Sequence, residues 1–399
     1  MAKSKKKWMK LRHRVVRAIA YAILYPYSRI KYGLTVKKFK EEEKRPYLVL
    51  YNHQTAFDQF FVGMSFRQSL YYVASEDLFS KGWISSLIRY LVAPIPIKKQ
   101  ATDVAAVMTC IRLAREGGSI ALAPEGNRTY SGKTEYINPA IAPMARKMGL
   151  PILLYRIEGG YGVHPRWSDV VRRGRMVCGV SRKIEPQEYQ SMTDEELCAL
   201  IRSELYVNEG QKDHCFYHKR SAEYLERAMY VCPQCGLSVF ESKKDTVTCK
   251  RCGRAVRYLP SKELSGVGFA FPFHFTSEWY DYQCDFVNRL NPADYTKEPL
   301  YRDTAALSEV IVYKKKKPLC KRASIALYGD RITVGDAVFP FDEISAVTVL
   351  GKNKLNVYYD KRIYQLKGGK RFNALKYVNL YYRYRNASKG DTDGQFLGL

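Results

Sequence analysis

The feature that most constrains the fold is a short apolar run that ends in Asn52-His53 and is followed by Asp58. Residues 47–51 have the length and composition of a buried strand. Residues five apart on a straight helix lie about 140° apart around its axis. The two side chains can therefore meet only if His53 lies in a bend and Asp58 lies in the helix that follows. This predicts a strand, a turn and a helix that set a carboxylate beside an imidazole, as a general base requires.

A second stretch supports a site at this position. By itself, the spacing of His53 and Asp58 is also consistent with a histidine that merely lies near an unrelated surface acid. Residues 119–123 are another predicted buried strand, and residues 124–129 (Pro-Glu-Gly-Asn-Arg-Thr) follow at once. Ligands of α/β sheets bind beyond the carboxyl ends of the strands. We therefore expect the two strand ends, with His53 and Arg128, to form one site.

These stretches resemble motifs of the glycerolipid (lysophospholipid) acyltransferase family. Asn52-His53-x4-Asp58 is similar to the first family motif, N-H-x4-D, and residues 124–129 are similar to the third, P-E-G-x-R-[ST]. Residues 93–99 resemble the second motif, with Lys99 where Arg is usual, and residues 150–154 resemble the fourth. The order and spacing agree across about residues 15–185.

The resemblance implies an O-acyltransferase. It would transfer a fatty acyl group from acyl-CoA or acyl carrier protein to the free hydroxyl of 1-acyl-glycerol-3-phosphate or a similar lysophospholipid, giving phosphatidic acid. His53 would be the general base, and Asp58 would orient it. The expected substrate-binding residues are Glu125, Gly126, Arg128, Lys99 and Thr129.

The chemistry of the individual residues further defines the role expected of each one. No G-x-S-x-G occurs, so direct attack by the substrate hydroxyl is expected in place of an acyl-enzyme. Arg128 and Lys99 are candidates for the phosphate, although a lysine lacks the bidentate fork of an arginine. Glu125 is expected to hold Arg128 or a substrate hydroxyl; a purely structural ion pair with Arg128 is the alternative. Gly126 permits the turn.

Charge and hydropathy suggest a membrane surface as partner. The net charge is +27, and residues 1–45 contribute +12 of it. Apolar residues between 15 and 24 follow helical spacing, with Trp8 and several tyrosines nearby. A basic amphipathic helix of this kind is typical of the membrane interface, although it could also pack on the domain that follows.

A membrane-spanning helix is not expected. No run approaches the roughly 20 apolar residues that span a bilayer. A secretory signal is not expected either, because no small-residue cleavage site follows the N-terminal apolar run. We expect a peripheral or monotopic protein on the cytoplasmic face of the cell membrane, bound to anionic lipid.

The fold class is predicted as α/β, with smaller units after it. Residues 1–45 would be the interface helix and residues 46–230 a layered sheet-and-helix acyltransferase domain. Predicted strands are 47–51, 70–74, 119–123, 152–157 and 176–180. Predicted helices are 103–116 with Thr102 as cap, 194–206 with a Thr193/Glu196 capping box, and 221–230.

Four cysteines predict a zinc ribbon at residues 231–258. Two C-x2-C knuckles, each followed by glycine, supply Cys232, Cys235, Cys249 and Cys252. Four thiolates leave no open coordination position, so one structural Zn²⁺ and no catalytic cofactor are expected. Disulfide pairing is the alternative, but the six other cysteines are scattered, which favours reduced thiols.

The remaining chain is predicted to be mostly β. Residues 259–309 are predicted to be an aromatic-rich connector with a helix at 278–290, and residues 388–399 a mobile tail. Residues 310–387 contain seven short predicted strands, the first at 310–313, and then a helix capped by Asn373. This order resembles the pleckstrin-homology-like fold. Residues 314–317, four lysines, would lie on its first hairpin and either contact anionic headgroups or be solvated.

Two other functions are compatible with parts of the sequence. A non-catalytic lipid-binding scaffold would keep the membrane features, but it does not explain the full set of His53, Asp58, Glu125 and Arg128. A nucleic-acid binder could use the ribbon and the positive charge, but it leaves both strand-end motifs unexplained. No nucleic-acid partner is therefore expected.

Overall fold

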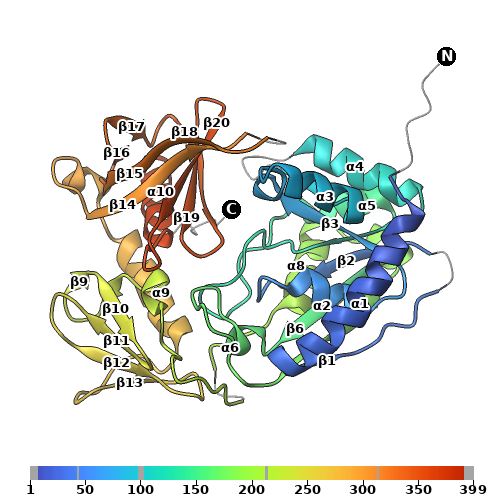
Figure 1. Cartoon of the computed structure of the whole chain (residues 1–399), viewed down its shortest axis with the longest axis horizontal. Helices are drawn as coiled ribbons and strands as arrows, with labels where there is room; N and C mark the ends of the chain where they lie inside the picture. The colour runs from blue at the N-terminus through green and yellow to red at the C-terminus, as the bar shows by residue number, and fades with distance from the viewer. Residues whose placement is uncertain (1–7, 43–44, 98–102, 212–213, 312–313, 391–399) are drawn as a thin grey trace.

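The computed structural model describes residues 8–42, 45–97, 103–211, 214–311 and 314–390. A layered sheet-and-helix unit forms the N-terminal half, followed by a small β unit with four cysteines and a larger antiparallel sheet (Figure 1). The two β units lie together on one side of the molecule, with the sheet-and-helix unit on the other. The predicted fold class is confirmed.

A mixed sheet of seven strands forms the centre of the N-terminal unit, in the order β1-β7-β6-β2-β5-β3-β4. The five strands from β6 to β4 run parallel, and β7 is antiparallel to β6. All five predicted strands are present. The strands are Leu34–Val36 (β1), Leu48–Tyr51 (β2), Leu70–Ser75 (β3), Ile95–Ile97 (β4), Ser119–Leu122 (β5), Ile152–Glu158 (β6) and Met176–Ile184 (β7).

Helices cover both faces of this sheet, because alternate strand residues point to opposite sides. In β2, Leu48 and Leu50 pack in one core with α4, α5 and α8, and Val49 and Tyr51 pack in another with α1 and α2. The helices are Leu11–Tyr32 (α1), Asp58–Met64 (α2), Trp83–Val92 (α3), Val104–Arg115 (α4), Ile141–Met148 (α5), Gly160–Val163 (α6), Pro186–Gln190 (α7) and Asp194–Leu205 (α8), with a 3-10 turn at Glu76–Phe79.

Two predicted helix starts can be compared with the structure. The Thr193/Glu196 capping box of α8 is confirmed, with both reciprocal hydrogen bonds present. For α4, the predicted cap Thr102 is wrong and itself lies outside the described residues. The cap is Asp103, whose carboxylate accepts a 3.1 Å hydrogen bond from the backbone N–H of Ala106. An aspartate satisfies an unpaired N–H of the first turn as well as a threonine does.

The helix predicted at residues 221–230 is wrong. The segment contains only a 3-10 turn, Leu225–Arg227. Tyr224 has a φ of +72°, which interrupts any helix at that point. Arg227 is buried and donates to the carbonyl of Trp167 and to Asp169, so contacts distant in sequence replace the local helical hydrogen bonds.

The cysteine-containing unit is a small two-sheet structure. A two-stranded hairpin consists of Val231–Cys232 (β8) and Gly236–Leu237 (β9). An antiparallel sheet follows, made of Phe240–Lys243 (β10), Thr246–Cys249 (β11), Ala255–Tyr258 (β12) and Leu264–Gly266 (β13). The predicted connector helix is present as Thr276–Asn288 (α9), with a 3-10 turn at Pro292–Tyr295.

The C-terminal unit is a curled antiparallel sheet of seven strands, in the order β17-β16-β15-β14-β20-β19-β18. Its first strand is Tyr301–Glu309 (β14), not residues 310–313, of which 312 and 313 lie outside the described residues. Because β14 contains several small and polar residues, it lacks the alternation of hydrophobic and polar residues by which a strand is recognised in a sequence. The others are Lys317–Leu327 (β15), Arg331–Val334 (β16), Ala337–Pro340 (β17), Ile344–Leu350 (β18), Lys354–Tyr359 (β19) and Arg362–Gly368 (β20).

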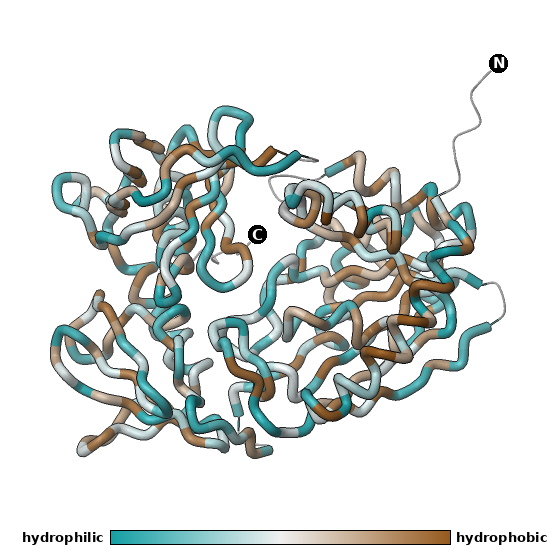
Figure 2. Tube along the Cα trace, viewed as in Figure 1, coloured by the Kyte–Doolittle hydropathy of each residue, from teal (hydrophilic) through white to brown (hydrophobic). Residues whose placement is uncertain are grey.

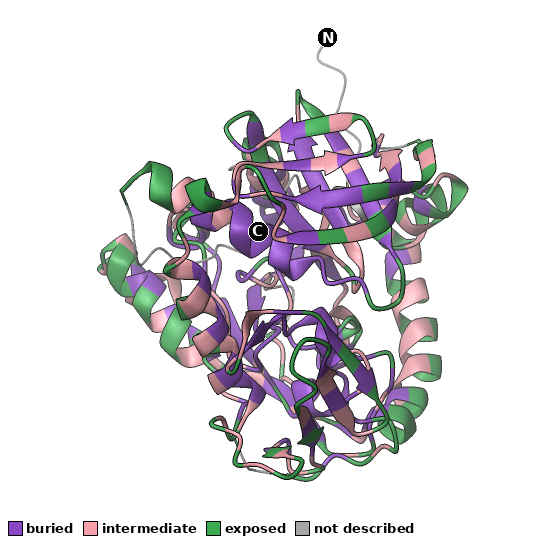
Figure 3. Cartoon of the chain, turned by 90° about the vertical axis from the view of Figure 1, so that its left-hand side faces the viewer, coloured by how far each residue is buried: buried purple, intermediate pink, exposed green. Residues whose placement is uncertain are grey.

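The helix Leu375–Ser388 (α10) follows the last strand and packs against this sheet. The N-cap residue is Ala374, one residue after the predicted cap Asn373. Asn373 Oδ1 still accepts a 3.0 Å hydrogen bond from the backbone N–H of Lys376. The cysteine-containing unit, α9 and the C-terminal sheet share one hydrophobic core. In Figure 3, buried residues alternate with exposed ones along the strands of this sheet, and the helices at the margins present exposed outer faces.

Candidate active site

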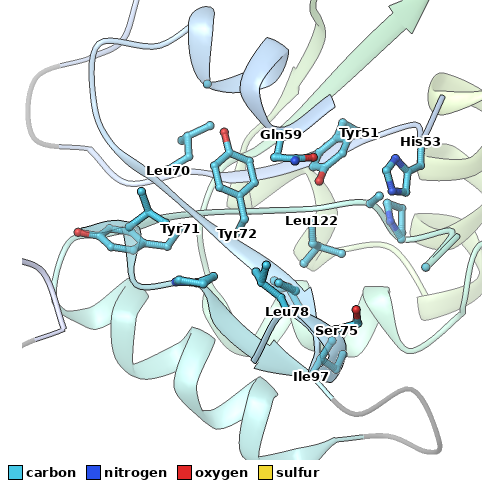
Figure 4. Close-up of a pocket in the computed structure, with 18 of the residues that line it drawn as sticks. Tyr51, His53, Gln59, Leu70, Tyr71, Tyr72, Ser75, Leu78, Ile97 and Leu122 are labelled. Atoms are coloured by element: carbon cyan, nitrogen blue, oxygen red, sulfur yellow. The ribbon is translucent and has the colours of Figure 1, made fainter. Parts of the chain in front are cut away.

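A cavity of about 1160 Å³ lies beyond the ends of β2 and β5. Its walls come from the central sheet, α1, α3, residues 122–128 and the turn between β18 and β19. Most of its surface is apolar. His53 lies at one side of the cavity and Tyr71 at the other, with Tyr72 and Leu122 between them (Figure 4). A cavity of this size and polarity suits a long aliphatic ligand.

The structure brings His53 and Asp58 into direct contact. His53 follows β2 and Asp58 is the first residue of α2, so the predicted strand, bend and helix are present. His53 Nδ1 lies 2.8 Å from Asp58 Oδ2. The side chain of His53 is 22% exposed, whereas that of Asp58 is fully buried. The ring therefore lies at the cavity wall while its partner is shielded from water.

Backbone and hydroxyl donors hold the Asp58 carboxylate in place. The N–H groups of Gln54 and Thr55 donate to it at 2.7 and 2.9 Å, and Thr55 Oγ1 donates at 2.6 Å. All these donors require an acceptor at Asp58, so the proton between the pair belongs on His53 Nδ1. This tautomer directs the lone pair of Nε2 away from Asp58.

Burial lowers the pKa of His53 below its ordinary value, and it outweighs the opposing effect of Asp58. The positive charges of Arg128 and Arg166 lower the pKa further. The imidazole is therefore neutral near pH 7, which is the form that can accept a proton.

Glu125 contacts the backbone of the other motif. Its Oε1 accepts a 2.7 Å hydrogen bond from the backbone N–H of His53. Its Oε2 accepts a hydrogen bond of the same length from the backbone N–H of Glu135. The sequence suggested Arg128 or a substrate hydroxyl as its partner; the contacts found are two backbone amides. Burial raises the pKa of Glu125 well above its ordinary value. Glu125 thus fixes the bend that carries His53.

Three neighbouring residues support the same bend. The N–H of Thr129 donates to the carbonyl of His53 at 3.1 Å, and Thr129 Oγ1 donates to Glu135 at 3.0 Å. Asn52 pairs with both backbone groups of Ile157 on β6, at 2.9 and 2.7 Å. Gly126 has a φ of +68°, a conformation that glycine adopts without strain.

Arg128 lies at the cavity wall next to the C-terminal sheet. Its Nη2 donates to the carbonyl of Gly351 at 3.4 Å, and its buried Nη1 has no hydrogen-bond partner within the described residues. Burial, then the charge of Arg166, lowers the pKa of Arg128 to about 10, so the guanidinium is still charged at neutral pH. Lys99, the second predicted phosphate ligand, lies outside the described residues.

Sequence reasoning missed the residues that surround Arg128. Arg166 is 3% exposed and lines the cavity. His164 is also buried, and burial followed by the charges of Lys352 and Arg128 lowers its pKa to about 3. These residues follow β6 or belong to the C-terminal sheet, far from the motifs in sequence. Their basic character was the available signal, but the chain contains 66 Lys and Arg, so it could not single them out.

The four predicted cysteines come together in space. The sulfurs of Cys232, Cys235, Cys249 and Cys252 all lie within 4.8 Å of one another. Cys232 Sγ is 3.7 Å from Cys252 Sγ, and Cys235 Sγ is 3.6 Å from Cys249 Sγ. Tetrahedral metal–sulfur bonds of about 2.3 Å place sulfurs about 3.8 Å apart. The cluster can therefore bind a metal ion.

The helices that wall the cavity also have exposed apolar faces. On α1, Val16, Ala20 and Leu24 line the cavity, and hydrophobic and hydrophilic residues alternate along the helix (Figure 2). Its outer face is exposed at Leu11, Val15, Ile19, Ile23, Tyr27 and Ile30. Among the helices that the structure describes, none has the length and hydropathy required to cross a bilayer.

α3 lies against α1 and extends this exposed face. Arg12 Nε donates to the carbonyl of Tyr90 at 2.7 Å, and the Arg12 guanidinium lies 4.0 Å from the centre of the Tyr90 ring. Trp83 is 75% exposed. The other exposed apolar residues of α3 are Ile84, Leu87, Tyr90 and Val92. The cavity therefore lies beneath two helices with apolar outer surfaces.

Comparison with known proteins identifies part of this chain. Residues 34–157 match the family model described as Acyltransferase, so the chain contains an acyltransferase domain. The segment includes His53, Asp58, Glu125 and Arg128. Among solved structures, the chain is similar to a 1-acyl-sn-glycerophosphate acyltransferase from Thermotoga maritima, at 21% identity and a TM-score of 0.40, with 49% of this chain and 80% of that chain covered. No curated protein matches the chain.

Proposed function

We propose that this protein is a membrane-associated O-acyltransferase that transfers a fatty acyl group from acyl-CoA or acyl carrier protein to a lysophospholipid. The acceptor is the free hydroxyl of 1-acyl-glycerol-3-phosphate or a similar lipid, and the product is phosphatidic acid. The observation that carries this proposal is the contact between His53 and the buried Asp58 at the wall of an apolar cavity that also contains Arg128.

The arrangement supports transfer in a single attack. Neutral His53 donates its Nδ1–H to Asp58, and its Nε2 takes the proton of the acceptor hydroxyl as that oxygen attacks the thioester carbonyl carbon. Asp58 stabilises the imidazolium that forms. The carbon–sulfur bond then breaks, and His53 returns the proton to the departing sulfur. The products are the new ester and a free thiol.

The expected substrate-binding residues divide into two groups. Arg128 would bind the acceptor phosphate, together with Lys99, since cations stabilise phosphate by charge-assisted hydrogen bonds. Glu125, Gly126 and Thr129 act through the bend: their backbone and side-chain contacts set the positions of His53 and Arg128. The aliphatic chains would occupy the apolar part of the cavity.

A lipid substrate also explains the exposed faces of α1 and α3. Their inner sides line the cavity and their outer sides are apolar, so lipid could reach the cavity from an interface on which both helices lie. The excess of Lys and Arg favours an anionic surface. We further propose peripheral or monotopic attachment at the cytoplasmic face of the cell membrane.

The cysteine cluster would bind one structural Zn²⁺. Four thiolates fill a tetrahedral site, which leaves the metal no position for substrate. The C-terminal sheet, for which the sequence suggests a pleckstrin-homology-like fold, would contribute residues 314–317 to contact with anionic lipid. Neither unit is assigned a chemical step in transfer.

The test is a turnover assay with 1-acyl-glycerol-3-phosphate as acceptor and radiolabelled acyl-CoA or acyl carrier protein as donor. Phosphatidic acid should form, and His53→Ala should abolish it while folding and vesicle binding are retained. A native protein that binds vesicles but transfers no acyl group from either donor would instead be a non-catalytic lipid-binding scaffold.

A further inference from the structure

The turn between β18 and β19, taken together with the last two residues of β18 (residues 349–352), reaches the cavity beside Arg128. Val349, Leu350 and Gly351 all line the cavity, although they belong to the C-terminal sheet. The hydrogen bond from Arg128 to Gly351 joins residues 223 positions apart in the sequence. Part of the wall of the acyltransferase cavity is thus supplied by a different structural unit.

Arg166 fastens this turn to the acyltransferase motif. Its Nη2 donates to the carbonyl of Val349 at 3.0 Å and its Nε to that of Gly351 at 3.4 Å. Its Nη1 donates to the carbonyl of Arg128 at 2.8 Å. One planar guanidinium therefore connects the turn with the backbone of Arg128, and its rigid fork fixes their relative positions.

A second contact fastens the other end of the turn. Lys352 Nζ lies 2.9 Å from Asp169 Oδ1, and Asp169 also pairs with the buried Arg227 at 2.8 Å. The hydrogen bonds of the two arginines to the turn and the ion pair of Lys352 hold it from both sides. The turn is therefore a fixed wall of the cavity.

The turn also determines how Arg128 faces the cavity. The carbonyl of Gly351 accepts a hydrogen bond from Arg128 Nη2, whereas Arg128 Nη1 is buried without a hydrogen-bond partner within the described residues. A buried N–H without an acceptor is costly, so Arg128, which lines the cavity, retains hydrogen-bonding capacity for a ligand acceptor. A phosphate oxygen fits both the charge and the hydrogen bonding.

We propose that the β18–β19 turn is part of the acceptor site and selects lysophospholipids whose phosphate carries no headgroup. This rests on the acyltransferase function proposed above. A phosphate monoester carries about −1.5 to −2 charges at pH 7, which suits the two guanidinium groups of Arg128 and Arg166 in the cavity wall. A headgroup on that phosphate would have to occupy the space beside Leu350 and Gly351. Arg166 is a positioning residue, because it acts through Arg128 and the turn.

Three substitutions test this in the full-length protein. With lysophosphatidic acid, Arg166→Ala should raise KM about tenfold with a smaller change in kcat, since a charge-assisted contact that positions Arg128 is lost. The KM of Arg166→Lys should fall between the values of this variant and of the native protein, because an ammonium keeps the charge but lacks the planar fork that reaches all three carbonyls. Leu350→Ala should shift the kcat/KM ratio about tenfold toward lysophosphatidylglycerol by removing part of the wall.

A binding measurement keeps the test independent of turnover. Calorimetry without donor should show tighter binding of lysophosphatidic acid than of lysophosphatidylglycerol, and Arg166→Ala or Leu350→Ala should reduce that preference. Asp336→Ala is the matched control, because Asp336 lies exposed in the β16–β17 turn of the same sheet; it should change nothing. Thermal denaturation shows whether each variant is folded. If Arg166→Ala does not fold, Leu350→Ala still tests the role of the turn.

The outcomes separate the two proposals. Native protein that transfers no acyl group refutes the proposed function, whatever it binds. Native protein without a preference for the unsubstituted phosphate, or folded Leu350→Ala and Arg166→Lys variants with native KM and native acceptor preference, would overturn the assignment of the turn.

Discussion

Glu125 Oε1 accepts a 2.7 Å hydrogen bond from the backbone N–H of His53, so the acid of one sequence motif fixes the backbone of the other. Its second oxygen accepts from the N–H of Glu135 at the same distance. With 5% of its surface exposed, Glu125 is a buried connection between two strand ends. The two motifs thus form one unit in which the backbone of His53 cannot shift without breaking this hydrogen bond.

Replacing Glu125 by Gln should destabilise this unit. The amide oxygen can still accept from one backbone N–H, but the amide nitrogen cannot accept from the other, which leaves a buried donor unpaired at a cost of about 1–3 kcal/mol. We expect a lower free energy of unfolding in urea and a reduced kcat. Glu195→Gln, at an exposed position on α8, is the control. Native stability in Glu125→Gln would contradict this role.

Asp58→Asn should show whether the Asp58 carboxylate is needed for catalysis by His53 and not only for folding. The asparagine oxygen can still accept from His53 and from the N–H groups of Gln54 and Thr55, whereas the Thr55 hydroxyl must rotate to accept from the new amide. The negative charge that stabilises the imidazolium is lost. We expect kcat to fall by about 10²- to 10⁴-fold, the range for loss of general acid–base catalysis, with an unchanged circular dichroism spectrum. Near-native kcat would exclude Asp58 as the orienting group.

The pH dependence of kcat/KM should report the ionisation of His53. Only the neutral imidazole accepts a proton, and burial places its pKa below the ordinary value of 6.5. Activity should therefore be constant above that pKa and fall tenfold per pH unit below it. Because Asp58 raises this pKa, Asp58→Asn should move the midpoint to lower pH. An acidic limb with a midpoint above 6.5 would contradict this assignment.

The outer face of α1 should govern binding to vesicles. Ile19 and Ile23 are 56% and 62% exposed. The double variant Ile19→Asp/Ile23→Asp removes two apolar side chains, each contributing up to about 2 kcal/mol when buried in lipid, so partitioning onto anionic vesicles should fall at least about tenfold. The matched control is Ala199→Asp/Ser203→Asp on α8, which adds the same charge at exposed positions on the opposite face of the sheet. Equal loss in both variants would indicate a general charge effect.

Metal removal should unfold the cysteine-containing unit. Metal analysis should find about one zinc per chain, and Cys232→Ser/Cys249→Ser should lose it. These two cysteines are buried in the core that the unit shares with α9 and the C-terminal sheet, so loss of metal should lower the melting temperature of this half of the protein. Cys320→Ser, outside the cluster, should retain the metal. A folded native protein without metal would refute the site.

The sequence by itself determined the features whose parts lie close together in the chain. His53 and Asp58, the Thr193/Glu196 capping box and the two C-x2-C knuckles each depend on a few neighbouring residues, and hydrophobic alternation located the central strands. In each case, a turn or a helix start sets the geometry almost independently of the rest of the fold.

Only the tertiary structure decided what lies opposite these motifs. Glu125 was expected to meet Arg128 or substrate, yet it contacts the backbone of His53, and Arg128 meets Gly351 from a distant sheet. The helix predicted at 221–230 is absent, because Arg227 makes buried contacts with residues distant in the sequence in place of helical hydrogen bonds. Local spacing carries no information about which surface the chain will later fold against. Contacts across about 200 residues depend on how whole units pack.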